Sequence, residues 1–151
     1  MTWLLDTNIL LRLSDSGSVH HSACIHALST LKARGDQLCI CTQNAIEYFV
    51  VATRPREVNG LGKSAEQSLI DIRTFRAMFN WLPEPARIDA IWESLVDRYQ
   101  IAGKQAHDAR LVAIMVAHKI ISLLTLNAAH FQRYAEIQAV SPHSILSSAT
   151  P

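Results

Sequence analysis

The sequence predicts an α/β fold, a three-layer α/β/α sandwich around a mostly parallel sheet of about five strands. Short apolar segments typical of strands alternate along the chain with longer segments of helical periodicity. Consecutive parallel strands need a crossover connection, usually a helix, so this alternation indicates a parallel sheet covered on both faces. The length of 151 residues fits one domain, which we place at residues 1–141. The Ser- and Pro-containing segment at 142–151 is predicted to be a loose tail.

The first third of the chain shows the alternation clearly. Residues 3–5 are apolar throughout and predict a strand buried on both faces. Residues 20–34 carry apolar side chains at helical spacing, and Gly35 follows where helices commonly end. A second strand is predicted at 38–41. The next helix, at 45–53, is predicted to have Thr42 as its N-cap and to end before Pro55.

The rest of the chain repeats the pattern. Ser64 and Gln67 have the spacing of a capping box and predict a helix start there. Prolines at 83 and 85 close the following strand. The remaining elements are predicted as helices at 64–77, 88–99 and 107–118, a short helical turn near Phe131, and strands at 78–82, 121–125 and 137–140.

Composition excludes several classes of protein. Hydrophobic residues make up 49% of the chain and charged residues 18%, which excludes intrinsic disorder and leaves apolar surface for self-association. The net charge of +1 excludes nucleic-acid binding by bulk charge, although not by a local site. No apolar run has the length of a membrane span, and the N-terminus lacks the basic leader of a signal peptide. Three cysteines without a CxxC motif fit a reducing, cytoplasmic compartment.

Acidic residues stand close to the ends of predicted strands. Asp6 follows the first strand, Glu47 lies early in the helix after the second, and Asp108 opens the most apolar helix. Ligand sites of parallel sheets lie at the carboxyl ends of strands, so we expect these carboxylates to meet there. Because they would repel one another, a cation between them is favoured, and hard oxygen ligands suit Mg²⁺ or Mn²⁺. The pattern is consistent with metal-dependent phosphodiester hydrolysis.

Each acid also has an ordinary structural explanation. Asp6 could form a turn and cap a helix, and Asp108 could be a favourable charge at a helix N-terminus. Glu47 could be a solvated helix residue. The spacing of the residues leaves these readings open.

Four segments resemble the PIN-domain family in order and spacing over nearly the whole chain. The segments are LLDTNILL at 4–11, QNAIEY at 43–48, GKQAHDARLVA at 103–113 and LLTLNAAHF at 123–131. Within that family the chain looks most like VapC, the toxin of bacterial type II toxin–antitoxin pairs. The resemblance implies a Mg²⁺- or Mn²⁺-dependent ribonuclease, a homodimer, and inhibition by a small antitoxin protein docked beside the active site.

The resemblance also implies roles for individual residues. Asp6, Glu47 and Asp108 match the acids that bind the metal and activate water. Thr125 matches a hydroxyl residue near the site, and Thr7 and Asn8 belong to the segment that supports it.

The chain departs from the family pattern at the fourth position. Asn127 and His130 stand where the family often has carboxylates. Either residue could still complete the metal site, with His130 better suited to Mn²⁺ than to Mg²⁺. The alternatives are a catalytically weakened protein that binds RNA or protein, and an RNA-processing nuclease outside toxin–antitoxin systems.

Three basic residues, Arg54, Arg56 and Lys63, bracket the Gly-containing loop at 59–62. Arginine forks onto phosphates and stacks on bases, so these residues are predicted to guide RNA to the mouth of the site. A solvated loop is the alternative interpretation.

Overall fold

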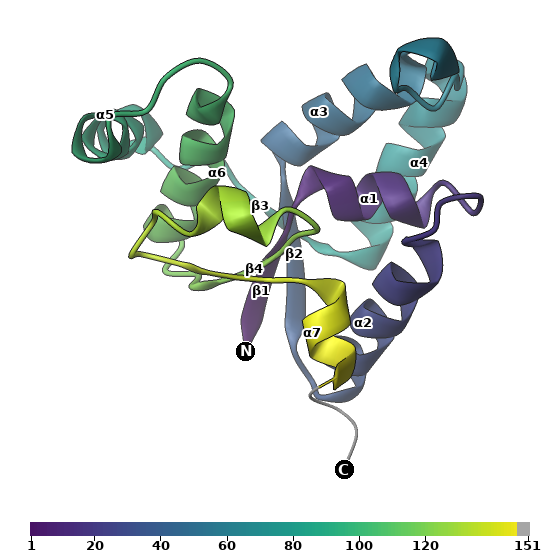
Figure 1. The fold of residues 1–151 in the computed structure, drawn as a ribbon, viewed down its shortest axis with the longest axis horizontal. Coiled ribbons are helices and arrows are strands. Elements are labelled where there is room, and N and C mark those ends of the chain that lie inside the picture. The colour runs from purple at the N-terminus through teal and green to yellow at the C-terminus, as the bar shows by residue number, and fades with distance from the viewer. Residues whose placement is uncertain (148–151) are drawn as a thin grey trace.

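A computed structural model describes residues 1–147 and contains a five-stranded sheet in the order β3-β2-β1-β4-β5. Every neighbouring pair of strands is parallel, with Leu4 aligned to Cys39 on one side and to Leu123 on the other. Helices cover both faces of the sheet (Figure 1). The predicted three-layer α/β/α architecture is therefore confirmed.

The strands are short, and most of the helices are longer. The strands are β1 (Thr2–Leu5), β2 (Gln37–Cys41), β3 (Asn80–Leu82), β4 (Ser122–Leu124) and β5 (Gln138–Val140). The helices are α1 (Thr7–Leu13), α2 (His21–Ala33), α3 (Thr42–Thr53), α4 (Ala65–Met78), α5 (Ile88–Tyr99), α6 (Gln105–Ala117) and α7 (Pro142–Ser147), with 3₁₀ turns η1 (Arg56–Val58) and η2 (Ala128–Phe131). None of the helices in residues 1–147 is both long and apolar enough to cross a membrane.

Alternate side chains of β1 enter different cores. Trp3 and Leu5 pack with α1, α2, α3, α4 and α7, whereas Leu4 packs with α5 and α6 on the other face. This follows from the two-residue period of a strand, and it explains why the central strand is apolar at its three buried positions, Trp3 to Leu5. The central strand is fixed from both sides, so the residue that follows it, Asp6, has a well-defined place at the carboxyl edge.

Two helix starts near this edge differ from the predictions. Helix α1 begins directly after β1 with Asp6 as its N-cap, although no helix was predicted there. Its Ile9 and Leu10 are buried, which gives this short helix the tertiary support that its own length does not provide. Helix α3 begins at Thr42 with Cys41 as its N-cap, because the Asn44 side chain accepts the Cys41 backbone N–H at 2.9 Å.

The prediction of a loose tail from 142 is wrong for residues 142–147, which form α7. Pro142 and Ile145 are buried, and α7 packs against α2. Two apolar residues among serines do not form a periodic pattern, so the segment has no helical signal of its own. Residues 148–151 of the predicted tail lie outside the described residues.

The packing of α7 predicts that Ile145→Ala destabilises the protein by about 2–4 kcal/mol, because the change leaves a cavity in the core. Ile121→Ala is the matched control, since Ile121 is 63% exposed and Ile145 only 5%. Urea unfolding at neutral pH measures both. A loss for Ile145→Ala no larger than that of the control would contradict the packing of α7.

Candidate active site

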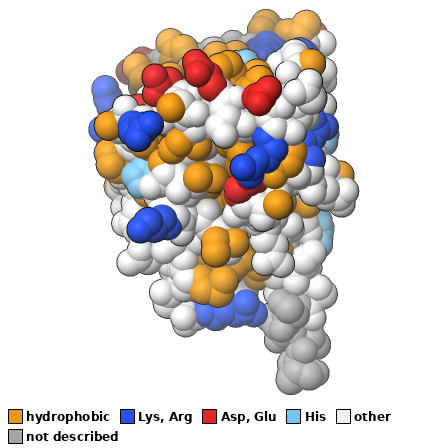
Figure 2. Space-filling view, turned by 90° about the vertical axis from the view of Figure 1, so that its left-hand side faces the viewer, with side chains coloured by type: hydrophobic (Ala, Val, Ile, Leu, Met, Phe, Trp, Pro, Cys, Tyr) orange, Lys and Arg blue, Asp and Glu red, His pale blue; other side chains and the backbone are white. Residues whose placement is uncertain are grey.

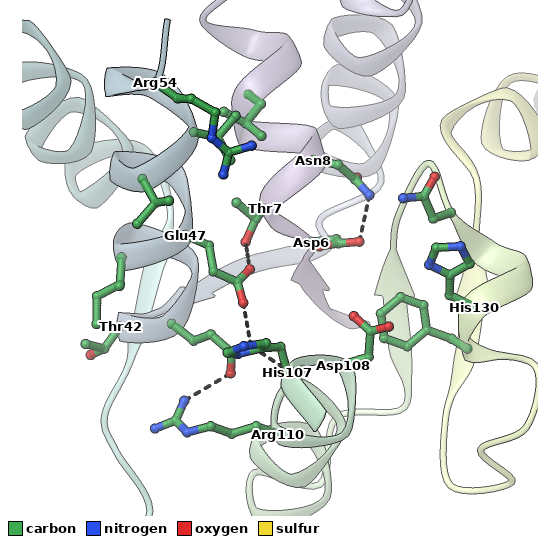
Figure 3. A pocket seen from close by; sticks show the side chains of 17 residues that line it. Asp6, Thr7, Asn8, Thr42, Glu47, Arg54, His107, Asp108, Arg110 and His130 are labelled. Carbon is green, nitrogen blue, oxygen red and sulfur yellow. Dashed lines mark hydrogen bonds between the residues drawn. The ribbon is translucent and has the colours of Figure 1, made fainter. Parts of the chain in front are cut away.

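A cavity of about 680 Å³ opens at the carboxyl edge of the sheet. Asp6, Glu47 and Asp108 all line it, although they come from the end of β1, from α3 and from α6 (Figure 3). Their charges act on one another, since both Glu47 and Asp108 disfavour ionisation of Asp6. The fold therefore brings the three predicted acids to one cavity. The roles of these acids in metal binding and catalysis stay predictions.

Asp6 is held by two neutral donors. Its Oδ2 accepts hydrogen bonds from Asn8 Nδ2 at 2.7 Å and from Thr125 Oγ1 at 2.5 Å. Burial raises the pKa of Asp6 to about 6, and repulsion from Glu47 and Asp108 adds to the rise, while the Thr125 hydrogen bond opposes it. The Thr7 backbone N–H also stabilises the charged form of Asp6 and lowers its pKa, whereas no side chain of the described residues donates a hydrogen bond to Oδ1. Oδ1 therefore keeps acceptor capacity for a ligand.

Thr125 and Asn8 join the ends of β1 and β4. Thr125 is fully buried, and its Oγ1 also accepts hydrogen bonds from Asn8 Nδ2 at 3.1 Å and from the Asn127 backbone N–H at 3.0 Å. Asn8 Oδ1 accepts the backbone N–H of Leu126 at 3.1 Å. Both residues were predicted to support the site, and these contacts hold Asp6 in one orientation.

Glu47 accepts one hydrogen bond on each carboxylate oxygen. Thr7 Oγ1 donates to Oε2 at 2.7 Å, and Gln43 Nε2 donates to Oε1 at 2.8 Å. Thr7 in turn accepts a hydrogen bond from Asn44 Nδ2 at 3.2 Å. Asn44 is fully buried and also donates to the Leu5 carbonyl, so it fixes the start of α3 against the end of β1.

Gln43 connects α3 to α6. Its Nε2 also donates to the His107 carbonyl at 2.9 Å, and its Oε1 accepts a hydrogen bond from Arg110 Nη1 at 3.0 Å. Arg110 forms a salt bridge with Glu84 as well. Gln43, Asn44 and Arg110 were not predicted as site residues. The available signal was an unusual pair of amide residues at the start of an otherwise apolar helix.

Asp108 differs from the other two acids because no side chain or backbone group in residues 1–147 donates a hydrogen bond to it. Burial raises its pKa and the negative charge of Glu47 adds to the rise, while interactions with His130, His107 and Arg133 oppose it. Both of its oxygens are therefore available to water or to a cation.

The side chains of the cavity suit Mg²⁺, which keeps part of its water shell, better than an ion held entirely by protein ligands. Within the described residues, no three His, Cys, Asp or Glu side chains form a cluster that could hold a metal ion by themselves. Mg²⁺ commonly uses one or two carboxylates and completes its shell with water and substrate phosphates. The free oxygens of Asp6 and Asp108, in a cavity where carboxylates repel one another, meet that requirement.

Asn127 and His130 line the same cavity, both with exposed side chains. Neither side chain forms a hydrogen bond with another described residue. The family often has carboxylates at these positions, and this chain has an amide and an imidazole instead.

The three predicted basic residues lie in different places. Arg54 lines the cavity with the acids, whereas Arg56 and Lys63 line a separate hollow of about 410 Å³. Lys63 is also engaged, because its Nζ lies 2.7 Å from Asp71 Oδ2. Burial disfavours the charged form of Asp71. Hydrogen bonds from Lys63, Tyr48 and Gln67 outweigh this effect of burial and lower the pKa of Asp71 from its usual value of 3.8. Lys63 thus links the loop to α4.

The PIN domain family model matches residues 3–137. The chain therefore belongs to the PIN-domain family. No curated protein sequence matches it significantly.

Solved structures share this fold over most of the chain. The VapBC2 complex of Rickettsia felis bound to promoter DNA contains a chain 17% identical to this one, with a TM-score of 0.72, covering 93% of this chain and 98% of that one. A toxin–antitoxin complex from Klebsiella pneumoniae matches at 25% identity and a TM-score of 0.60, covering 92% and 96%. VapC20 of Mycobacterium tuberculosis, a sarcin-ricin loop cleaving toxin, matches at 15% identity and a TM-score of 0.58, covering 80% and 86%.

In protein kept free of divalent ions, the charge of Asp6 is expected to lower the free energy of unfolding in a pH-dependent way. Its pKa is 3.8 in the unfolded chain and about 6 in the folded one, so the contribution of Asp6 to stability is most favourable below pH 4 and is lost as pH rises from about 4 to about 6. Asp6→Asn should therefore increase the free energy of unfolding at pH 7 by roughly 2–3 kcal/mol, with the difference shrinking toward pH 4.

Urea unfolding in EDTA between pH 4 and pH 7 tests this expectation. Asp97→Asn, at an exposed acid of α5, is the control. A constant difference between Asp6→Asn and wild type across that range would contradict the account of Asp6.

Proposed function

We propose that this protein is a divalent-metal-dependent endoribonuclease of the VapC toxin type. The observation that carries the proposal is the convergence of Asp6, Glu47 and Asp108 on one cavity at the carboxyl edge of a PIN-domain sheet. The likeness to toxin chains, one of them described as cleaving the sarcin-ricin loop, supports RNA as the substrate.

Asp6 and Asp108 would hold Mg²⁺ or Mn²⁺ through their free oxygens, with Glu47 contributing charge or binding through water. When bound, such an ion lowers the pKa of a coordinated water and neutralises charge that develops on a phosphate. Asn127 and His130 line the same cavity and would complete the site.

The side chains of this protein have distinct tasks in hydrolysis. The water oxygen forms a bond to phosphorus, one ester oxygen leaves and takes a proton from solvent, and the proton of the water passes to a carboxylate. Asp108 is suited to accept it because none of its oxygens is committed to a hydrogen bond. Thr125 and Asn8 keep Asp6 in place, and Gln43 and Thr7 do the same for Glu47.

The same proposal includes the partners of a VapC-type toxin. A small antitoxin would cover the cavity, and the protein would act as a homodimer in the cytoplasm. The neighbours VapBC2 and the Klebsiella pneumoniae complex were solved as toxin–antitoxin complexes, which supports an antitoxin partner.

Asp108→Asn is expected to reduce metal-dependent RNA cleavage by about a hundredfold or more, because it removes a carboxylate while preserving shape. The measurement is the cleavage rate of a labelled single-stranded RNA by purified protein in Mg²⁺ or Mn²⁺, with EDTA abolishing the activity of wild type.

Asp97→Asn is the control for this assay and should keep wild-type activity. Cleavage that survives in Asp108→Asn, or that persists in EDTA, would refute the proposed active site. Growth arrest of a bacterial host by wild type but not by Asp108→Asn would favour a toxin over an RNA-processing nuclease.

A catalytically weakened binding protein is the second candidate, and the neutral side chains at Asn127 and His130 favour it. If the missing carboxylate limits metal binding, His130→Asp should increase Mn²⁺ affinity roughly tenfold, because metal affinity follows the charge of the ligands. Calorimetry compares it with His26→Asp, an exposed control on α2. Unchanged affinity in His130→Asp would show that this position does not limit the site.

A further inference from the structure

A second cavity lies next to the proposed active site. It has a volume of about 370 Å³ and shares Asp108 and His130 with the first cavity. Asp108 and His130 therefore lie where the two cavities meet. Three carboxylates line the first cavity, whereas Asp108 is the one carboxylate among the described residues that lines the second. The lining of the second cavity is Lys104, Gln105, Asp108, Ala129, His130 and Arg133.

Two cations and one carboxylate, Asp108, line the second cavity, and the charge of Arg133 acts on Asp108 without forming a salt bridge with it. Lys104 and Arg133 are exposed, and neither forms a salt bridge with any acid in residues 1–147. In contrast, Arg110 pairs with Glu84 and Lys63 pairs with Asp71.

The guanidinium of Arg133 is oriented by Gln105. Arg133 Nη1 donates to Gln105 Oε1 at 2.8 Å, which leaves the other N–H groups of the guanidinium for a ligand. A planar guanidinium with one hydrogen-bond partner and an ammonium lining the same cavity favour a phosphate, which accepts several charge-assisted hydrogen bonds.

A nucleic-acid strand at the proposed active site has an electrostatic problem. The strand carries a negative charge on every phosphate, and the acids that would act on one phosphate repel its neighbours. Cationic side chains beside the flanking phosphates would offset this repulsion. Figure 2, which looks onto the side where α5 and α6 lie, shows basic side chains scattered among acidic and hydrophobic ones, so such compensation must be local.

We propose that the second cavity is a phosphate subsite, in which Lys104 and Arg133 bind the phosphate next to the scissile one on an RNA strand. This inference rests on the proposed function, because it takes Asp108 to mark the position of the scissile bond. Because Asp108 and His130 line both cavities, the RNA strand would pass these two residues as it runs from one cavity to the other.

Arg54 completes this path on the other side of the acids. It lines the first cavity, and Figure 3 shows Arg54 and His130 on opposite sides of Glu47 and Asp6. Arg54 also has no salt-bridge partner in the part of the chain that the structure describes. Cations therefore stand at both ends of the acidic cavity, as a bound strand requires.

The test compares Lys104→Gln/Arg133→Gln with a control that loses the same two charges elsewhere, Arg34→Gln/Arg73→Gln. Arg34 and Arg73 are exposed and line neither cavity. All binding measurements use the full chain with the additional change Asp6→Asn, so that a labelled single-stranded oligoribonucleotide stays intact. Fluorescence anisotropy gives the affinity as a function of salt concentration.

Loss of one phosphate contact should make the slope of log K against log salt shallower by about 0.7 in Lys104→Gln/Arg133→Gln and leave the control unchanged. Without the Asp6 change, the same pair of substitutions should raise the KM for RNA cleavage roughly tenfold, since binding weakens, while kcat changes much less. Circular dichroism checks that each variant is folded.

The outcomes separate this inference from the proposed function. An altered salt slope in a protein that never cleaves RNA would support the subsite and refute the nuclease. Cleaving protein in which slope and KM equal those of the control would refute the subsite and leave the nuclease intact. A protein that binds no RNA would refute the subsite as well.

Discussion

The structure depends on one electrostatic constraint, the meeting of three carboxylates at the carboxyl edge of a parallel sheet. The sheet topology places the end of β1 at the centre of that edge, and Asp6 there lines the same cavity as Glu47 and Asp108. Burial and the two neighbouring acids raise the pKa of Asp6 to about 6, which means that the folded chain carries the cost of this charge. The proposed divalent cation would relieve this repulsion, which is why the proposed function places it beside Asp6.

Neutral polar side chains, rather than basic ones, hold the acids in place. Asp6 accepts hydrogen bonds from Thr125 and Asn8. Glu47 accepts them from Thr7 and Gln43, and Asn44 donates a hydrogen bond to Thr7. A buried arginine or lysine in these positions would pair with the acids and compete with a cation. Of the basic residues that line this cavity, Arg110 pairs with Glu84 and Arg54 has no salt-bridge partner among the described residues, so neither pairs directly with the three acids.

The sequence predicted the sheet and most helices because apolar periodicity and capping residues are local signals. Ser64 accepts the Gln67 backbone N–H at 3.1 Å, as the capping motif predicted. Helix α7 had no local signal, because its burial comes from packing against a helix more than a hundred residues earlier in the chain. The three acids were predicted from their positions after strands, but Gln43 and Arg133 were not, since their partners lie on other elements. Lys63 shows the same limit: its pairing with Asp71 depends on how the loop folds onto α4.

The central proposal is that Asp6 and Asp108 bind a divalent cation with the help of the Glu47 charge, and calorimetric titration with Mn²⁺ tests it most directly. Wild type should bind Mn²⁺ saturably, and Asp6→Asn/Glu47→Gln/Asp108→Asn, with the same shape and no charge at these positions, should not. Circular dichroism would establish that the triple variant is folded. Absence of saturable binding by wild type, or equal binding by the folded triple variant, would contradict the account.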